Sequence, residues 1–270
     1  MMITTVFKKA DISNLKNTYR VAVVLDVLRA TTTITTALKN GCREVIPVAD
    51  VDEARKLGDD PNVLLCGERS AVKLPGFNLG NSPLEFNCDT VSGKTVVLTT
   101  TNGTGAIKMA AKKSGTVVIG SLLNSKAVAK KLLQFNGDIL LVCSGTRGNF
   151  SMEDTLAAGF IVKEFLSLKG IKNYSGQEIT KQRSNVSDVY AAETPIDNNI
   201  ENNIVLNDSS VAAYRISLFY NDNTLDALYD SLHGQKLAQL GMRHDLTYCS
   251  KLNTCNLVPI YKDGIITATT

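Results

Sequence analysis

Residues 21–33 read Val21-Ala22-Val23-Val24-Leu25-Asp26-Val27-Leu28-Arg29-Ala30-Thr31-Thr32-Thr33. The first five form an unbroken apolar run, which is typical of a strand buried on both faces of a parallel sheet. Asp26 follows the run directly, and Arg29 and the threonines lead into a helical pattern at 34–38. Ligands of α/β proteins bind outside the carboxyl ends of such strands. The stretch therefore predicts a place where a carboxylate meets the N–H groups of a helix start.

Apolar runs of the same kind alternate with helical patterns through the first two thirds of the chain. The predicted strands are 21–25, 44–49, 63–66, 95–99, 116–119 and 138–143, and the predicted crossover helices include 106–113, 126–135 and 151–168. This alternation favours an α/β fold with a largely parallel or mixed sheet and helices on both of its faces.

The last third of the chain has a different pattern. Residues 170–210 are polar and rich in Asn and Ser, which suggests an irregular excursion or lid within a single domain that spans 1–270. Helical patterns follow at 211–220, 225–232 and 236–240, so we expect a helical C-terminal portion. An apolar run at 257–261, followed by the turn Lys262-Asp263-Gly264, predicts a closing strand or hairpin.

Composition and charge argue against several classes of protein. The 29 basic and 26 acidic residues give a net charge of +3, which is too small for a nucleic-acid groove or a membrane-binding face. The six cysteines contain no Cys-x-x-Cys pair, and Cys66 and Cys143 lie inside apolar runs, as packed thiols do. No signal-peptide core is found at the N-terminus, and no apolar run approaches the roughly 18 residues of a spanning helix. We expect a reduced, cytoplasmic protein.

Residues able to handle charge follow four of the predicted strands. They are Asp26 with Arg29, then Gly67-Glu68-Arg69, then Thr99-Thr100-Thr101-Asn102-Gly103-Thr104, and finally Ser144-Gly145-Thr146-Arg147-Gly148. The helix after the last of these strands begins Ser151-Met152-Glu153-Asp154 and adds two carboxylates. Because the carboxyl ends of parallel strands share one edge of a sheet, we expect these side chains to converge.

This mixture of acids, arginines and hydroxyls suits a multiply anionic, phosphorylated substrate held with a divalent metal ion. Carboxylates bind hard cations such as Mg²⁺, whereas arginine forks bind phosphate and other oxyanions. No His or Cys cluster has the spacing of a zinc site. The two histidines, His233 and His244, are interpreted as structural, which leaves carboxylates or water as general bases. Mg²⁺ is the cofactor that we expect.

Several of these residues also have a simpler interpretation. Asp26 could be a turn residue or a helix cap, and Asp154, three residues after Ser151, could close a capping box. Arg69 and Arg147 could be solvated loop arginines. Cys143 lies four residues before Arg147, whereas the cysteine phosphatase loop needs five intervening residues, so a packed core thiol is the better interpretation.

A longer set of motifs occurs in order along the chain. It comprises Asp26-Val27-Leu28-Arg29-Ala30-Thr31-Thr32, Gly67-Glu68-Arg69, Pro75-Gly76-Phe77-Asn78-Leu79-Gly80-Asn81-Ser82-Pro83, Leu98-Thr99-Thr100-Thr101-Asn102-Gly103-Thr104, Cys143-Ser144-Gly145-Thr146, Glu153-Asp154, His233-Gly234 and Val258-Pro259. Together these motifs resemble the 2-phosphosulfolactate phosphatase family over nearly the whole chain. One departure is Ser70-Ala71-Val72-Lys73, which stands where that family usually has a glycine-rich continuation.

The resemblance implies a three-layer α/β/α fold and a Mg²⁺-dependent phosphoric monoester hydrolase. Its reaction would convert (R)-2-phospho-3-sulfolactate to 3-sulfolactate and phosphate, a step of coenzyme M biosynthesis. We expect Glu68 and Asp154 to bind the metal, with Asp26 as a third ligand or as the phosphoryl acceptor, and Asp26, Arg29 and Asp154 to be catalytic. The expected substrate-binding residues are Arg29, Arg69, Asn81, Ser82, Thr101, Asn102, Ser144 and Arg147.

Two other functions stay open at this point. The chain could bind a phosphorylated metabolite without turning it over, or it could be a phosphatase for another phosphorylated hydroxy acid. In each case the expected partner is a small anionic phosphorylated molecule, rather than nucleic acid or a membrane. Assembly into a homo-oligomer is also left open.

Overall fold

The computed structural model describes residues 1–171, 174 and 204–269. Its strands are β1 (Met2–Val6), β2 (Val21–Leu25), β3 (Glu44–Val48), β4 (Val63–Arg69), β5 (Val72–Lys73), β6 (Thr95–Thr99), β7 (Val117–Gly120), β8 (Ile139–Cys143), β9 (Val205–Leu206), β10 (Val258–Lys262) and β11 (Ile265–Thr269). Its α-helices are α1 (Ala30–Lys39), α2 (Val51–Lys56), α3 (Cys88–Val91), α4 (Gly103–Ala111), α5 (Ser125–Leu132), α6 (Met152–Leu168), α8 (Asp208–Tyr220), α9 (Thr224–Asp230), α10 (Leu232–Gln239) and α11 (Arg243–Cys249). Short 3-10 helices are η1 (Lys9–Asn14), η2 (Pro83–Glu85) and η3 (Leu122–Asn124).

The strands form one mixed sheet in the order β5-β4-β6-β3-β11-β10-β7-β2-β8-β1-β9. Strands β4, β6 and β3 are parallel, and so are β7, β2, β8, β1 and β9. The C-terminal hairpin β10–β11 lies between these two parallel groups and is antiparallel to its neighbours β7 and β3. The predicted mixed sheet and C-terminal hairpin are therefore confirmed, and the hairpin joins the two groups at the centre.

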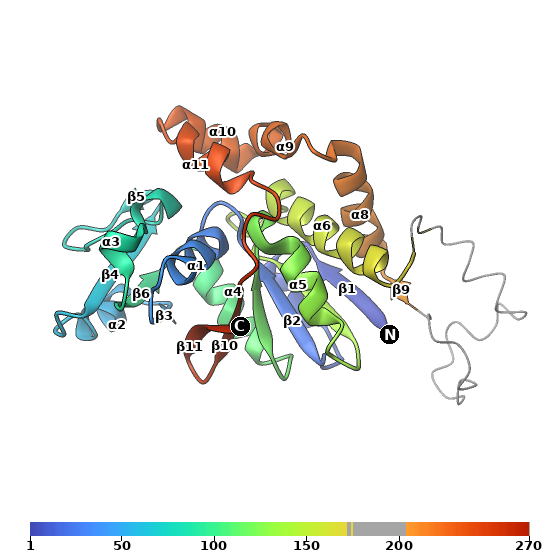
Figure 1. Ribbon diagram of the computed structural model, residues 1–270, viewed down its shortest axis with the longest axis horizontal. Helices are drawn as coiled ribbons and strands as arrows, with labels where there is room; N and C mark the ends of the chain where they lie inside the picture. The colour runs from blue at the N-terminus through green and yellow to red at the C-terminus, as the bar shows by residue number, and fades with distance from the viewer. Residues whose placement is uncertain (172–173, 175–203, 270) are drawn as a thin grey trace, which may run out of the picture.

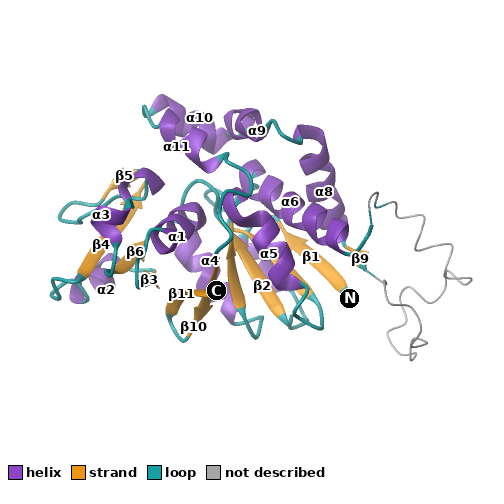
Figure 2. Ribbon diagram, in the orientation of Figure 1, coloured by secondary structure: helices purple, strands orange, loops and turns teal. Residues whose placement is uncertain are grey.

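Strand β2 shows how the sequence builds two hydrophobic layers. Successive side chains of a strand point to opposite faces of the sheet. Val21, Val23 and Leu25 pack in one cluster with α5, α6 and the C-terminal helices, whereas Ala22 and Val24 pack in a second cluster with α1 and α4. Helices consequently cover both faces of the sheet, which confirms the three-layer α/β/α arrangement (Figure 2).

The C-terminal portion is helical, as predicted. Helix α8 packs along α6, and α9, α10 and α11 lie together above the sheet in Figure 1. Residues 175–203, which make up most of the predicted excursion or lid at 170–210, lie outside the described residues. The end of that range is regular, because β9 pairs with β1 and α8 begins at Asp208. None of the helices in the described ranges has the length and apolarity needed to span a membrane.

Candidate active site

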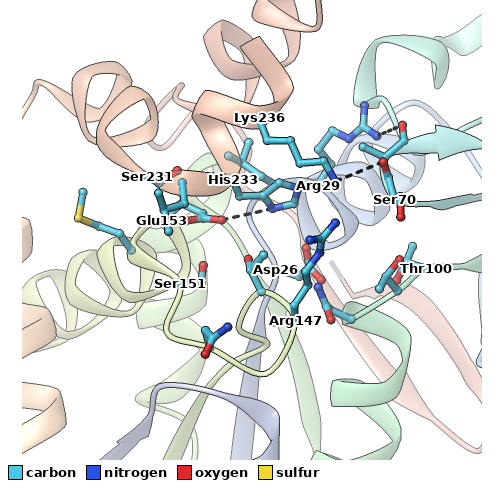
Figure 3. Close-up of a pocket in the computed structure, with 18 of the residues that line it drawn as sticks. Asp26, Arg29, Ser70, Thr100, Arg147, Ser151, Glu153, Ser231, His233 and Lys236 are labelled. Atoms are coloured by element: carbon cyan, nitrogen blue, oxygen red, sulfur yellow. Dashed lines mark hydrogen bonds and ion pairs between the residues drawn. The ribbon is translucent and has the colours of Figure 1, made fainter. Parts of the chain in front are cut away.

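A cavity of about 450 Å³ opens at the carboxyl ends of β2, β4, β6 and β8 (Figure 3). The predicted site residues on its wall are Asp26, Arg29, Glu68, Asn81, Thr101, Asn102 and Arg147. The predicted residues that are not on the wall are Arg69, Ser82, Ser144 and Asp154. The strand ends of both parallel groups therefore converge on one hollow, and α9 and α10 cover it from the other side.

Asp26 lies where β2 ends and is 8% exposed. Its Oδ1 accepts a hydrogen bond from the N–H of Ala30, the first residue of α1, at 3.3 Å. Its Oδ2 accepts no hydrogen bond from any described residue and lies against the start of α4, where a Cβ added to Gly103 would stand 2.9 Å away. Asp26 therefore contacts the start of a helix, as a helix-capping residue would. It still offers one carboxylate oxygen to the cavity.

Glu68 lies near the end of β4, and its carboxylate organises two loops of the wall. Its Oε1 accepts hydrogen bonds from the N–H and the hydroxyl of Thr101, both at 2.9 Å, and its Oε2 accepts one from the N–H of Ala71 at 2.6 Å. An ionised carboxylate has about four acceptor positions, so one is left for a ligand. Glu68 thus fixes the loop after β6 against the β4–β5 turn.

Arg29 reaches the wall but is already paired within the protein. Its NH1 lies 2.6 Å from Oδ2 of Asp245 in α11, and its NH2 donates to the carbonyl of Ala71 at 3.1 Å. Both charged side chains are at most 5% exposed. Asp245 also accepts the hydroxyl of Ser82 at 2.6 Å, so Ser82 supports this pair instead of facing the cavity. The charge that we expected to bind substrate is therefore balanced by Asp245.

Asp154 lies behind the wall and holds two loops together. Ser151 caps α6 by accepting the N–H of Asp154 at 3.3 Å, as a capping box requires. The carboxylate of Asp154, however, accepts the N–H of Val27 at 2.8 Å and that of Gly145 at 3.2 Å. These bonds tie the loop after β2 to the loop after β8. The structure therefore does not bring Asp154 to the cavity beside Asp26 and Glu68.

The two remaining predicted arginines differ. Arg69 donates to the carbonyl of Glu68 at 2.8 Å and to the hydroxyl of Thr99 at 3.1 Å, so its side chain is bound along the outside of the β4–β6 pair. Arg147 lines the cavity and makes no hydrogen bond or ion pair with the described part of the chain. Its φ of 53° is one of the positive values in the loop between β8 and α6. Of the two predicted arginines that line the cavity, Arg29 is paired with Asp245, and Arg147 has no counter-charge among the described residues.

Three further residues lie on the wall that were not assigned a catalytic, binding or metal role from the sequence, although Glu153 was expected near this edge. Nδ1 of His233 in α10 lies 3.5 Å from Oε1 of Glu153 in α6, and Nζ of Lys236 lies 3.5 Å from the carbonyl of Ser70 (Figure 3). The interpretation of His233 as merely structural is incomplete, because it lines the cavity. His233 belongs to one of the family-like motifs, but no local pattern marked Lys236.

The charged groups of the cavity affect one another. Burial, as the main cause, raises the pKa of Asp26 from 3.8 to about 6; His233 and the N–H of Ala30 lower it, and the negative charges of Glu68 and Glu153 raise it. Burial also raises the pKa of Asp154 well above its usual value, with further contributions from Glu153 and Asp26. The site is thus a cluster of buried acids for which a cation would relieve the mutual repulsion.

Two buried polar atoms have no hydrogen-bond partner in the described part of the chain, namely Oδ1 of Asn81 and Oγ of Ser144. Asn81 is 4% exposed and lies on the cavity wall, whereas Ser144 lies behind it. An unpaired buried acceptor costs about 1 to 3 kcal/mol, so such atoms are uncommon away from binding sites. The amide oxygen of Asn81 is available to a donor or a cation in the cavity.

The oxygen donors on the wall suit a Mg²⁺ ion that is held by few protein ligands. Within the described ranges, no group of three or more His, Cys, Asp or Glu side chains is placed to hold a metal ion. Mg²⁺ commonly uses only one or two carboxylates and completes its shell with water and substrate phosphate oxygens. Asp26 Oδ2, the remaining acceptor position of Glu68 and Asn81 Oδ1 are oxygen donors of this kind.

Comparisons with known proteins identify the family of the chain. A family model described as 2-phosphosulpholactate phosphatase matches residues 6–264. Proteins named "Probable 2-phosphosulfolactate phosphatase" are similar to the chain: the one from Clostridium beijerinckii is 37% identical over 99% of each chain, and the one from Clostridium tetani is 36% identical over 98% of this chain and 100% of its own. The one from Symbiobacterium thermophilum is 39% identical over 91% of this chain and 92% of its own. With its strand-end motifs gathered around one acidic cavity, the chain belongs to the 2-phosphosulpholactate phosphatase family.

Proposed function

We propose that the protein hydrolyses (R)-2-phospho-3-sulfolactate to 3-sulfolactate and phosphate in a Mg²⁺-dependent reaction, the type of step used in coenzyme M biosynthesis. The observation that carries the proposal is the cavity itself, which is lined at the edge of the sheet both by Asp26, whose Oδ2 accepts no hydrogen bond from a described residue, and by Arg147, which has no ion pair with one. Named relatives that match nearly the whole chain support the choice of substrate.

Asp26, Glu68 and Asn81 are the residues that we propose to hold Mg²⁺. When bound, the ion would offset the negative charge of the acids and of the phosphoryl oxygens. Phosphoryl transfer depends mainly on positioning and on charge stabilisation. In this site Arg147 would bind the phosphoryl oxygens, and the backbone N–H groups at the start of α4 would add a positive end of a helix dipole.

Asp26 has two candidate roles, and the geometry is compatible with both. Its Oδ2 could bind the metal, or it could attack phosphorus and carry the phosphoryl group. The stereochemical course at phosphorus, followed with a substrate whose phosphorus is made chiral by sulfur and oxygen isotopes, separates them. Two displacements through a phosphorylated Asp26 give retention of configuration, whereas a single displacement by water gives inversion.

His233 is positioned to serve the leaving group. With Nδ1 facing Glu153, its other ring nitrogen, Nε2, is left for a proton that can pass to the departing alkoxide oxygen. Glu153 is 2% exposed and would hold the ring in this orientation. In this arrangement Glu153 orients the histidine and Asp26 faces the phosphate.

A phosphate-release assay tests the proposal. Phosphosulfolactate, 2-phospholactate and phosphoglycerate are compared, each with added Mg²⁺ and with EDTA. We expect Mg²⁺-dependent turnover that is fastest with phosphosulfolactate. Faster release from another substrate would indicate a phosphatase for a different hydroxy acid, and tight binding without release would indicate a non-catalytic binding protein.

The cellular setting is part of the same proposal. All six cysteines are free and five of them are buried, as expected for a protein of a reducing compartment. We propose a cytoplasmic location, to be checked by fractionation of cells that express the tagged protein.

A further inference from the structure

We infer that Lys236 is a specificity-determining residue, which binds the acidic group of the substrate that lies farthest from the phosphate. The inference deepens the proposed function, on which it rests. The substrate we propose carries a phosphate, a carboxylate and a sulfonate on three carbons. A site for it needs more than one cation, and those cations must approach from different directions.

The basic side chains on the cavity wall can be sorted by their partners. Arg29 is balanced by Asp245 at 2.6 Å in a buried pair. His233 is paired with Glu153 at 3.5 Å. Arg147 and Lys236 remain, and neither forms an ion pair with a described residue. The positive charge free to meet a substrate is therefore that of these two side chains.

Lys236 makes one hydrogen bond within the described part of the chain, and this bond leaves the ammonium charge uncompensated. Its Nζ lies 3.5 Å from the carbonyl of Ser70, which is at the limit of a hydrogen bond. The nearby acids on the wall have other partners: Asp230 accepts the hydroxyl of Tyr220 at 2.8 Å, and Glu153 faces His233. A neutral carbonyl holds the side chain over the cavity without neutralising it, so an incoming anion can take its place.

The two free cations stand on different walls. Arg147 comes from the loop after β8, on the side where Asp26 ends β2, whereas Lys236 descends from α10 in the C-terminal cover (Figure 3). A phosphate bound near Asp26 and Arg147 would direct the rest of a short substrate toward α10. The ammonium of Lys236 can donate in three directions, which suits a tetrahedral sulfonate.

Lys236 would bind the distal acid and take no part in the chemistry of phosphate release. A residue that binds only the distal acid should affect affinity for a substrate that has this acid and should leave a substrate without it nearly unchanged. The matched pair is phosphosulfolactate and 2-phospholactate, which share the phosphate and the carboxylate and differ in the sulfonate.

The test compares Lys236→Met and Lys236→Arg with wild type on both substrates. For Lys236→Met we expect KM for phosphosulfolactate to rise about tenfold or more, the scale of one charge-assisted hydrogen bond, with little change in kcat. We expect KM for 2-phospholactate to change by less than about threefold, and Lys236→Arg to restore most of the affinity for phosphosulfolactate. Lys130→Met, on the exposed face of α5, is the control for the loss of one positive charge.

Equal rises in KM for both substrates would overturn the assignment, because Lys236 would then act on the phosphate or through the general field. Unchanged KM for phosphosulfolactate would also overturn it. Binding of 3-sulfolactate and of lactate, measured by calorimetry, gives a readout that needs no turnover. If wild type binds sulfolactate more tightly than lactate and Lys236→Met loses that difference, the assignment stands even if phosphosulfolactate is not hydrolysed; absence of the difference in wild type would overturn it.

Discussion

At the scale of single residues, Asp26 is a buried carboxylate whose ionised form lowers the stability of the folded protein. Its pKa is raised by burial from 3.8 to about 6. Because the folded-state pKa lies above the unfolded value, the contribution of Asp26 to stability is complete below about pH 4 and is lost as the pH rises through about 6. The metal-free protein therefore carries a destabilising charge at neutral pH, at the position where the proposed reaction needs it.

Asp26→Asn should stabilise the metal-free protein at pH 8 and lower the rate of phosphate release by about a thousandfold or more. A pKa raised from 3.8 to about 6 corresponds to at most about 3 kcal/mol, and the amide oxygen can still accept the N–H of Ala30. Urea unfolding in EDTA, at pH 5 and at pH 8, measures the gain, which should be larger at pH 8. A gain that does not depend on pH, or a loss at pH 8, would contradict the raised pKa.

Gly103 lets the start of α4 approach Asp26, and Gly103→Ala should damage the site. An added Cβ would stand 2.6 Å from Cβ of Ala30 and 2.9 Å from Oδ2 of Asp26, so one of these groups must move. Displacing a catalytic group by about 1 Å typically costs about a hundredfold in rate, so we expect kcat/KM to fall by tenfold to a hundredfold, to be measured by phosphate release.

Gly105→Ala in the same helix is the matched control. A Cβ there would meet only Nζ of Lys9, at 3.5 Å, and alanine favours the helix over glycine. Its kcat/KM should stay within about threefold of wild type, since nothing near Asp26 has to move. Equal activity of the two variants would show that the position of Asp26 does not depend on a glycine at residue 103.

At the scale of elements, the β4–β5 turn supports the cavity from one side. Ser70 and Ala71 connect the paired residues Arg69 and Val72, and both have positive φ, 56° and 74°. Two-residue hairpin turns of this kind favour glycine or asparagine. The departure from a glycine-rich sequence thus places two side chains in a left-handed backbone. The turn keeps its shape through the bonds that Ala71 makes with Glu68 and Arg29.

Ser70→Gly should raise stability by about 1 kcal/mol, because the left-handed conformation costs about that much for a residue with a Cβ. Thermal unfolding with calorimetry measures the change. Ser167→Gly, at an exposed position of α6, should instead lower stability by roughly 0.5 kcal/mol. A loss of stability in both variants would show that the turn is not strained.

The sequence predicts elements well where periodicity is unambiguous. The continuous apolar runs correspond to β2, β3, β4, β6, β7 and β8, and Cys143 is a buried core thiol as predicted. Strand β1 was missed because its buried centre includes Thr4 and Thr5, which weaken the apolar signal. Helices α2 and α11 were missed because each is short.

Parts of the site depend on contacts that no local pattern contains. Glu153 and Asp154 are adjacent, and the packing of α6 decides that Glu153 faces the cavity while Asp154 turns to the loops behind it. His233 and Lys236 reach the cavity from α10, far along the chain from Asp26. Spacing alone could predict the acids at the strand ends, but not the cover that closes over them.

At the scale of the whole molecule, the buried pair of Arg29 and Asp245 connects the C-terminal helices to the edge of the sheet. The two residues are 216 positions apart, and Arg29 also contacts Met242 and the carbonyl of Ala71. The pair therefore couples the loop after β2, the β4–β5 turn and α11. Since α10 precedes α11 directly, the same pair helps to keep His233 and Lys236 over the cavity.

Asp245→Asn should destabilise the protein by about 3 to 5 kcal/mol, because it leaves the guanidinium of Arg29 buried without a counter-charge. Asp226→Asn, on the exposed side of α9, should change stability by less than about 0.5 kcal/mol. The double variant Arg29→Met/Asp245→Leu should recover much of the loss, since no charge is left buried. Urea unfolding measures all three, and a wild-type midpoint for Asp245→Asn would contradict the coupling.

Phosphate release from phosphosulfolactate by wild type and by Asp26→Asn, at saturating Mg²⁺ and pH 8, tests most directly that the cavity at the end of β2 is a phosphatase site. The variant is expected to be at least as stable as wild type in EDTA, and urea unfolding in the assay buffer checks that it is folded, so a loss of activity cannot be attributed to unfolding. We predict turnover by wild type and a fall of about a thousandfold or more in the variant, the scale of losing an essential catalytic group. Turnover by Asp26→Asn at the wild-type rate would contradict the account.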